Sequence, residues 1–511
     1  MKNIFKIMLL SSLFVFGYGC TDLEEDLKGD YSENPGDPAP RKGNSPNVNK
    51  DQPADGLGPA FGRLFNGTAN HGSYFSISEI SSDEVVITQK GGDWFDGGIW
   101  IDMHQHTWQS TNDGFNNAWN DIYGGVAQCN ELLSSGSITS AESIAQLKTL
   151  RAYYYWRLLD LYGNVKIITT ATDVQQSTRA QVYAFVESEL LAALPDLSTA
   201  TQAYGRVNQS GANALLARLY LNAEIYTQTA QWQNAYDVAK RVVDAGLYDL
   251  SSDYASVFAP DNVENIEHIW VVPFDQATGT NMNFAQMTLH YPSQLTYDLA
   301  SQPWNGYSTL EEFYNSYEDG DARKTNNFIV GEQFDLNGTP ILDLAFDKAD
   351  PDGAEIDYTP AINELFPNGS RQAGARLGKF SFKIGQQDNM DNDYPLFRYG
   401  EILLTMAEAA MNLGNTGEAL DLVNELRARA GVADMASLDA ANLLAERGRE
   451  MFQESSRRTD LIRLGAWGDA WAFKNAHSSG INDNLNVFPI PNAAILSADA
   501  GFPYTQNSGY N

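Results

Sequence analysis

Two loop-like stretches contain the residues whose chemistry could bind a ligand. The first is the glycine-rich run 91–98, in which Trp94 follows Asp93. The second surrounds Trp304, where proline and an Asn-Gly pair indicate turns. A bulky aromatic residue in such a loop has little local core to enter, so we expect its ring to be exposed. An exposed ring can stack on a flat apolar face of a ligand, while nearby polar groups pair with its hydroxyl groups.

We therefore predict a binding site built from these two stretches. Trp94 and Trp304 are the expected stacking platforms, and Tyr291 is a third aromatic residue. The polar candidates are Asp93, Asn305 and Arg376. The alternative for each tryptophan is ordinary packing beneath a long loop, and for the three polar residues a structural role is the leading interpretation.

Little in the sequence indicates a catalytic site or a metal-binding site. No nucleophile elbow, phosphate loop or metalloprotease motif occurs. His104 and His106 could place two imidazoles on one side of a strand, but no third ligand is evident, and a structural or solvated pair is the preferred interpretation. Residues 347–357 are rich in Asp, yet Lys348 occupies the first ligand place of an EF-hand and no Glu closes the loop. We expect no catalytic residue, no metal and no cofactor, with a structural calcium ion at 347–357 as a minor alternative.

Composition and charge limit the classes of partner. The chain has 511 residues, of which 43% are hydrophobic and 12% aromatic, so a substantial core can form. The formal net charge of −32 repels phosphate backbones and anionic lipid surfaces. We therefore expect no nucleic-acid partner. Of the two cysteines, Cys129 lies in a helix-like segment and is expected to be a small buried residue rather than a reactive thiol.

The N-terminal segment has the pattern of an exported, lipid-anchored protein. A basic start precedes an apolar run at 7–18 that is too short to span a bilayer, and an acidic stretch follows Cys20. We predict a signal peptide at 1–19, lipidation of Cys20, and a polar tether at 20–56. Gly17 and Tyr18 depart from the usual bacterial lipoprotein signal, which has Leu and a small residue at those places. The alternative is a secreted protein whose cysteine lies near the cleavage point by chance.

Helical periodicity dominates the remainder of the chain. The strongest helical stretches are 114–133 with 141–162, 212–245, and 401–430. Alternation of Ala with large residues is typical of tetratricopeptide-like helix pairs. We predict a mostly α fold with helix pairs at about 57–250 and 392–475, interrupted by a large, irregular, loop-rich insertion at about 250–390.

Two finer expectations concern strands and charged segments. Within the insertion, residues 268–273 and 379–384 are predicted to be short strands. Charges of both signs alternate at 446–450 and 457–463, which indicates helix faces that are either solvated or mutually paired.

Several motifs, in order along the chain, resemble those of the SusD/RagB family, the D component of starch-utilisation-type systems. In the N-terminal half these are 81–84 (SSDE), 91–98 (GGDWFDGG), 117–123 (NAWNDIY), 150–155 (LRAYYY) and 160–165 (DLYGNV). In the C-terminal part they are 394–399 (YPLFRY), 423–431 (VNELRARAG), 446–450 (ERGRE), 457–463 (RRTDLIR), 488–491 (FPIP) and 506–510 (QNSGY). The resemblance extends over nearly all of 57–511, with Ser508 standing where the family usually has Pro.

The resemblance implies a SusD-like, tetratricopeptide-like scaffold with an irregular insertion. It also implies an outer-membrane lipoprotein displayed on the cell surface, whose partner is a SusC-like TonB-dependent transporter. In that family the D component captures an oligosaccharide, or a peptide in some branches, and caps the transporter. The acidic segment after Cys20 is similar to the surface-export signal of such lipoproteins.

The functional hypothesis is a non-catalytic glycan-binding lipoprotein for nutrient uptake and polysaccharide utilisation. A sugar ring presents a flat C–H face and a rim of hydroxyl groups, which suits the aromatic and polar candidates named above. The alternatives are a peptide-binding member of the same family and a secreted glycoside hydrolase. With 65 acidic residues, two carboxylates near one cleft would not by themselves support the hydrolase.

Overall fold

The computed structural model describes residues 53–170, 174–277, 281–344 and 353–510. The predicted signal peptide, Cys20 and most of the predicted tether lie outside the described residues, as does most of the Asp-rich segment at 347–357. No helix in the described ranges is long and apolar enough to span a bilayer.

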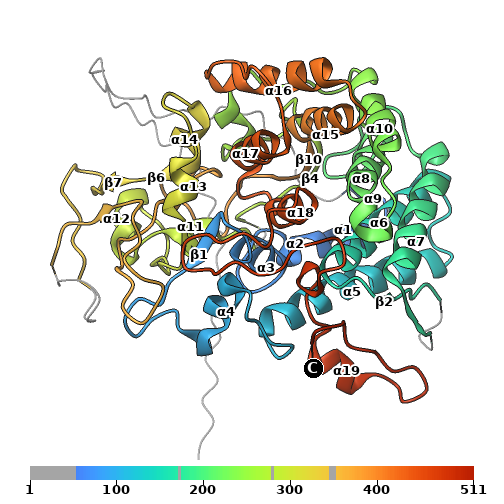
Figure 1. Cartoon of the computed structure of the whole chain (residues 1–511), viewed down its shortest axis with the longest axis horizontal. Coiled ribbons are helices and arrows are strands. Elements are labelled where there is room, and N and C mark those ends of the chain that lie inside the picture. The colour runs from blue at the N-terminus through green and yellow to red at the C-terminus, as the bar shows by residue number, and fades with distance from the viewer. Residues whose placement is uncertain (1–52, 171–173, 278–280, 345–352, 511) are drawn as a thin grey trace, which may run out of the picture. The chain divides into compact units, whose positions relative to one another are not determined.

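Helix pairs form the scaffold, as the periodicity predicts. With 46% helix and 9% strand, the fold is mostly α. The long helices are α5 (Asp113–Ser134), α6 (Ala141–Leu161), α7 (Arg179–Ala193), α8 (Gln209–Leu221), α10 (Trp232–Asp244), α15 (Tyr399–Asn412) and α16 (Thr416–Ala430). Helix α6 packs between α5 and α7, and α10 packs between α8 and α15, which in turn pairs with α16 (Figure 1).

Small residues explain how closely these helices approach. A Cβ atom at Gly125 of α5 would lie 2.3 Å from the Tyr154 ring of α6, so only glycine allows this contact. Ala235 and Ala239 of α10 are fully buried. Helix starts are fixed locally: the Thr178 side chain and Gln181 form a capping box at the start of α7.

Shorter helices complete the described chain. The α-helices are α1 (Gly58–Phe61), α2 (Phe65–Thr68), α3 (Tyr74–Ile80), α4 (Ile99–Gln105), α9 (Ala223–Thr227), α11 (Phe284–Thr288), α12 (Gln294–Tyr297), α13 (Glu311–Asn315), α14 (Ala322–Asn327), α17 (Ala440–Met451), α18 (Arg457–Arg463) and α19 (Asn492–Ser497). The 3-10 helices are η1 (Gly62–Leu64), η2 (Asp96–Gly98), η3 (Leu194–Asp196), η4 (Tyr254–Phe258), η5 (Tyr291–Ser293) and η6 (Asn484–Asn486).

The strands form two-stranded antiparallel pairs. They are β1 (Val85–Ile87) with β5 (Tyr307–Thr309), β2 (Val165–Lys166) with β3 (Gln176–Ser177), β4 (His268–Val272) with β10 (Tyr394–Arg398), β6 (Phe328–Ile329) with β9 (Arg376–Leu377), and β7 (Gly331–Glu332) with β8 (Asp357–Tyr358). The β4–β10 pair joins the two ends of the loop-rich insertion, which lies at the left of Figure 1 away from α5 to α10.

One of the two strand predictions in the insertion is wrong. Residues 268–273 contain β4, but 379–384 form no strand. The Lys379 ammonium is buried and donates to the carbonyl oxygens of Glu450 and Phe452 at 3.0 and 2.8 Å. Phe380 stacks on Tyr394. This segment is therefore held by side-chain contacts with the scaffold rather than by a backbone ladder.

The charged side chains at 446–450 are buried and form ion pairs. Of the two expected arrangements, the structure therefore has the paired one rather than the solvated one. Glu450 on α17 contacts Arg323 of the insertion at 3.1 Å and Arg398 at the end of β10 at 2.7 Å. Arg429 of α16 also binds Glu450. Burial alone would raise the pKa of Glu450, but Arg429, Arg398 and Arg323 hold that pKa well below its usual range.

Two buried carboxyl groups, Glu79 near the end of α3 and Glu84 just before β1, lie close together. Glu79 accepts a hydrogen bond from the backbone N–H of Ser455 at 2.6 Å, and Glu84 accepts one from that of Gln453 at 3.3 Å. Burial raises the pKa of Glu79 to about 7, and burial and Glu79 raise the pKa of Glu84 well above its usual value. The two carboxyl groups therefore bind protons more tightly in the folded protein than in the unfolded chain.

Replacing Glu79 with Gln tests whether the Glu79 carboxyl group binds a proton more tightly in the folded protein. Because folding raises the pKa of Glu79 from 4.5 to about 7, its protonation stabilises the fold fully below pH 4.5, and the contribution disappears as pH rises through 7. We expect the thermal midpoint of the Glu79→Gln variant to vary less between these pH values than that of the wild type. Parallel pH profiles for the two proteins would contradict the prediction, and the exposed Glu332→Gln variant is the control.

Candidate functional site

The pairing of β1 with β5 brings the two predicted binding loops together. Ile87 lies opposite Tyr307 in the antiparallel register, so the segment after β1 and the segment before β5 leave the sheet at the same end. The indole Nε1–H of Trp94 donates to the backbone carbonyl of Trp304 at 2.6 Å. Tyr291 joins them, since its hydroxyl donates to the Asp93 carboxylate. We call Trp94, Tyr291 and Trp304 the aromatic platform.

Trp94 is fixed in place by packing from below. Its ring lies so close to Gly306 that a Cβ atom there would be 2.4 Å from the indole. The ring edge also meets His71 and Tyr307, with centroids 5.2 and 6.3 Å away. Trp94 is half-buried, so part of the indole supports the loop and part faces outward.

His71 beneath Trp94 is neutral. Burial lowers the pKa of His71 to about 4, although Asp96 opposes the shift. Its Nδ1 forms a hydrogen bond of 2.7 Å with the Tyr307 hydroxyl, which also contacts the Ser76 hydroxyl at 2.7 Å. This buried polar chain fixes the floor of the platform without adding positive charge.

The backbone of both loops adopts an uncommon conformation. Trp94, Asp96 and Asn305 have φ values of 61°, 46° and 57°, in the left-handed region that non-glycine residues rarely occupy. Such conformations cost on the order of 1–3 kcal/mol each and cluster at ligand-binding sites. Here the surrounding contacts impose them and set the direction of the Trp94 ring.

Trp304 presents the most accessible ring of the platform. Its side chain is 37% exposed, while its backbone N–H donates to the carbonyl of Gln286 at 2.7 Å. The anchored backbone and the exposed ring together make a surface suited to stacking.

Two of the predicted polar residues lie beneath the surface. Asn305 and Arg376 are fully buried, and an Arg376 N–H donates to the Asn305 side-chain oxygen at 2.9 Å. Asn305 also donates to the carbonyl of Arg371 at 3.1 Å. The structural role weighed for them in the sequence thus fits their position, because they support the Trp304 loop from within. Asp93, the third polar candidate, is exposed beside the rings.

Lys90 links the two loops, and no sequence motif indicates this role. Its fully buried ammonium donates to the carbonyls of Thr88 and Gly306 at 3.3 and 3.1 Å. A cation that bonds to one carbonyl from each loop keeps the loops in register. Sequence reasoning missed this role because nothing local distinguishes Lys90 from a surface lysine.

Two further exposed rings flank the platform loops. Phe95 and Phe366 are each 48% exposed. Phe366 comes next to Leu365, whose carbonyl accepts from the N–H of Gln89 at 2.9 Å, so this segment of the insertion lies against the Trp94 loop. Phe95 lies within the glycine-rich run already singled out, whereas Phe366 is followed by Pro367 and an Asn-Gly pair at 368–369, which are turn signals that sequence reasoning did not connect with the site.

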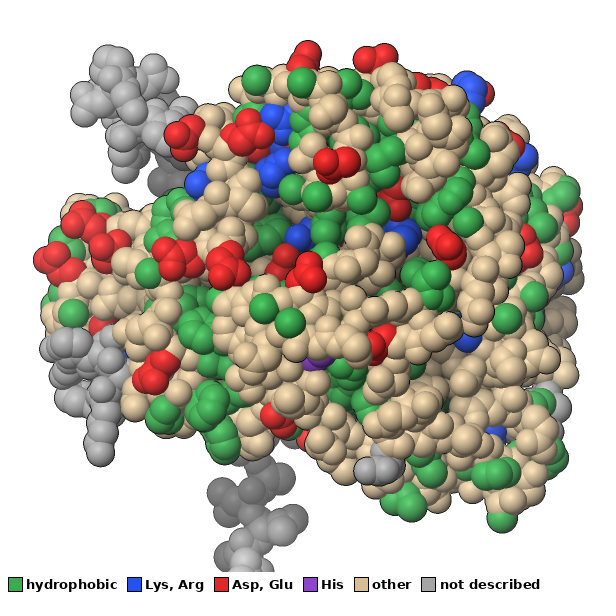
Figure 2. All heavy atoms as spheres, viewed as in Figure 1, with side chains coloured by type: hydrophobic (Ala, Val, Ile, Leu, Met, Phe, Trp, Pro, Cys, Tyr) green, Lys and Arg blue, Asp and Glu red, His purple; other side chains and the backbone are tan. Residues whose placement is uncertain are grey.

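The accessible charge beside the platform is negative. Asp93 and Asp96 are exposed. The cationic side chains beneath the platform, Lys90, Arg371 and Arg376, are fully buried. Figure 2 shows Asp and Glu side chains spread over the face in view, in line with the formal net charge of −32. The site therefore offers apolar ring faces and hydrogen-bond acceptors to a ligand without a strong negative charge.

The other candidate groups do not form a metal centre among the described residues. The side chain of His104 bonds to the carbonyl of Ala472 at 2.8 Å, and that of His106 bonds to His477 at 2.8 Å. Burial lowers the pKa of His104 to about 4 and that of His106 well below its usual value. In the described part of the chain, no group of three or more His, Cys, Asp or Glu side chains is arranged to hold a metal ion. Cys129 is buried, which raises the pKa of its thiol to about 12.

Substitution of Gly306 by Ala tests the packing under Trp94. The added methyl group would overlap the indole, so Trp94 must move or the β5 segment must shift. We expect a destabilisation of about 1–3 kcal/mol and a changed near-ultraviolet circular dichroism signal. Gly92→Ala is the matched control, since a Cβ there has no neighbour within 4 Å. Equal thermal midpoints and spectra for the two variants would contradict this contact.

Comparison with known proteins agrees with the architecture. A family model described as "SusD family" matches residues 361–510, and one described as "Starch-binding associating with outer membrane" matches residues 74–221. The chain is 27% identical over 417 residues to the starch-binding protein SusD of Bacteroides thetaiotaomicron, covering 73% of this chain and 74% of that protein. It is 23% identical over 432 residues to the SusD-like protein P25 of Formosa agariphila, covering 77% and 79%.

Solved structures share the fold. A laminarin-binding SusD-like protein superposes with a TM-score of 0.70 at 23% identity, covering 89% of this chain and 98% of that one. Surface glycan-binding protein A of Bacteroides thetaiotaomicron, in complex with laminarihexaose, superposes with a TM-score of 0.69 at 23% identity, covering 88% and 97%. At these identities the matches establish the fold alone.

Proposed function

The chain belongs to the SusD family, and from that premise we propose that it is a cell-surface lipoprotein that binds oligosaccharides at the aromatic platform for delivery to an outer-membrane transporter. The hydrogen bond from Trp94 to the Trp304 carbonyl is the observation that carries this proposal. It joins two aromatic loops that are 210 residues apart in the chain into one surface.

The chemistry of the platform supports a sugar ligand. Pyranose rings have flat C–H faces that stack on Trp and Tyr rings, and their hydroxyl groups pair with carboxylates such as Asp93. The relatives named as starch-binding and laminarin-binding proteins support the same ligand class. Since both loops are held by buried contacts, binding needs little further ordering of the protein.

Loss of the exposed indole should weaken glycan binding. We expect Trp304→Ala to lower the affinity for linear neutral glucan oligosaccharides at least about tenfold, because a stacking surface is removed. Isothermal titration calorimetry of the body without its signal and tether measures the effect. Trp232→Ala, which removes a half-buried indole from α10, is the control. Unchanged affinity in Trp304→Ala would contradict the proposed site.

The charge of the site predicts which glycans are rejected. Asp93 and Asp96 repel carboxylate and sulfate groups, so we expect uronic-acid or sulfated oligosaccharides to bind at least about tenfold more weakly than neutral ones of equal length. Competition titrations at low ionic strength compare the two classes. Asp93→Asn should reduce the difference in affinity between neutral and anionic oligosaccharides. Tighter binding of the anionic than of the neutral oligosaccharide to the wild type would contradict the proposed site.

Lipidation at Cys20 is the proposed anchor. A lipid at this position would confine the binding body to the membrane and raise its effective concentration near a transporter. We expect Cys20→Ala to abolish membrane retention in cell fractionation while glycan affinity of the soluble body stays unchanged. A variant that remains in the membrane fraction would contradict the anchor.

The proposal assigns transport to a partner and no cleavage to this chain. A TonB-dependent transporter of the SusC type is the expected partner, which co-purification from solubilised outer membranes can test. Incubation with a bound oligosaccharide should release no new reducing ends. Release of reducing ends would instead favour the glycoside hydrolase alternative, and calorimetric binding of peptides in place of glycans would favour the peptide-binding alternative.

A further inference from the structure

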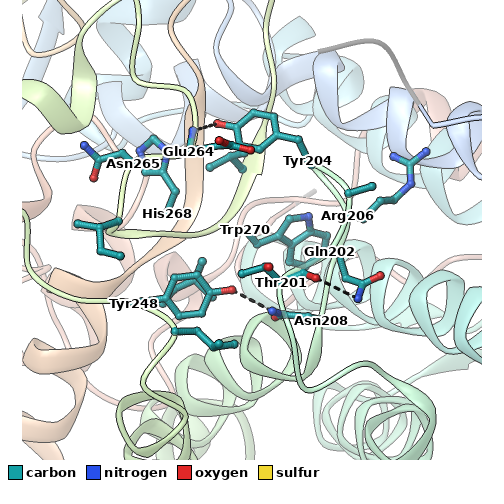
Figure 3. A pocket seen from close by; sticks show the side chains of 16 residues that line it. Thr201, Gln202, Tyr204, Arg206, Asn208, Tyr248, Glu264, Asn265, His268 and Trp270 are labelled. Atoms are coloured by element: carbon teal, nitrogen blue, oxygen red, sulfur yellow. Dashed lines mark hydrogen bonds between the residues drawn. The ribbon is translucent and has the colours of Figure 1, made fainter. Parts of the chain in front are cut away.

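A separate pocket of about 370 Å³ lies where the helical scaffold meets the start of the insertion, and it shares no lining residue with the aromatic platform. Its walls come from the loop that leads into α8, the turn after α10, and β4 together with the loop that leads into it (Figure 3). The volume is near the lower end of the range for small-molecule sites.

Two tyrosine rings are held rigidly in the walls. The Tyr204 hydroxyl donates to the Asp393 carboxylate at 2.5 Å and accepts from the backbone N–H of Glu264 at 3.3 Å. The Tyr248 hydroxyl accepts from the side-chain amide of Asn208 at 2.9 Å. Both tyrosines are half-buried, and Figure 3 shows them on either side of Trp270, which closes the pocket between them. Their ring positions are therefore set before any ligand arrives.

Polar groups at the rim have hydrogen-bonding capacity to spare. Glu264 is exposed, and its carboxylate has no hydrogen-bond or ion-pair partner in the described part of the chain. Its φ of 55° places it in the left-handed region, a strained conformation held by the bond to Tyr204. Among the residues that the structure describes, the Gln202 amide makes only a long contact of 3.4 Å with the carbonyl of Thr201.

The Arg and His side chains of the pocket are already engaged. The Arg206 guanidinium bonds to the Asp55 carboxylate at 2.7 and 3.0 Å and lies over the Phe61 ring. The His268 Nε2–H donates to the carbonyl of Val257 at 3.1 Å. The accessible charge is that of Glu264, so the pocket favours a ligand that is neutral and donates hydrogen bonds.

We propose that this pocket is a second sugar-binding site, which holds one or two units of a neutral saccharide. Tyr204 and Tyr248 provide the apolar walls, and the Glu264 carboxylate accepts hydrogen bonds from ligand hydroxyl groups. The inference rests on the proposed function for its ligand class alone, because the pocket and the platform have no residue in common. Two separated sites on one body would let a long chain be held at two points.

Disaccharides fit the pocket and serve as probes. We use maltose and laminaribiose, followed by saturation-transfer NMR, on the Trp304→Ala variant so that the platform contributes little. We expect residual binding of at least one disaccharide. Adding Glu264→Gln should weaken this binding about tenfold, since a hydrogen bond to a charged group is lost. Adding Tyr248→Ala should weaken it by a similar factor, and adding the exposed Glu332→Gln should leave it unchanged.

The outcomes separate this inference from the proposed function. If Trp304→Ala abolishes all binding of both disaccharides, the second site is overturned and the platform stands. If Glu264→Gln and Tyr248→Ala leave the residual binding unchanged while circular dichroism shows folded proteins, the second site is again overturned. If Glu264→Gln alone abolishes binding and Trp304→Ala has no effect, the pocket stands and the platform assignment fails. A wild type that binds neither disaccharide overturns the pocket, while longer oligosaccharides still decide the platform.

Discussion

Buried ion pairs around Glu450 determine how the insertion meets the helical scaffold. Glu450 on α17 binds Arg323 from the insertion, Arg398 from β10 and Arg429 from α16, and all four side chains are nearly inaccessible to solvent. An unpaired charge at such a depth is strongly destabilising, so these segments are stable only when assembled together. Because the insertion is fixed in this way, β5 can pair with β1 and bring the two aromatic loops together.

The platform itself is organised before a ligand binds. Trp94 is packed on Gly306, bonded to the Trp304 carbonyl, and held in a strained backbone conformation. Lys90 bridges carbonyls of both loops from beneath. A rigid arrangement of this kind reduces the entropy lost on binding, so modest stacking and hydrogen-bonding contacts can give useful affinity.

The sequence predicts the helices and loops better than it predicts the tertiary contacts between them. Periodicity with Ala at contact positions identifies the long helices, and Gly and Pro signals identify the loops of Trp94 and Trp304. That these loops touch depends on a pairing of two three-residue strands that have no strong local pattern. The residue type of Arg376 does not reveal that its side chain is buried rather than exposed at the surface. The segment at Lys379 resembles a strand in sequence, although the buried ammonium of Lys379 holds the segment to α17.

We propose that the loops of the insertion and the glycine-rich loop recognise the ligand, with the scaffold as their support and the anchor serving delivery. In this arrangement a neutral glycan lies on Trp304, with Tyr291 and Trp94 beside it. A crystal structure of the body bound to a linear neutral glucan hexasaccharide tests this most directly. We expect a sugar ring stacked on the Trp304 indole within hydrogen-bonding distance of Asp93. Glycan density elsewhere, with the platform unoccupied, would contradict it.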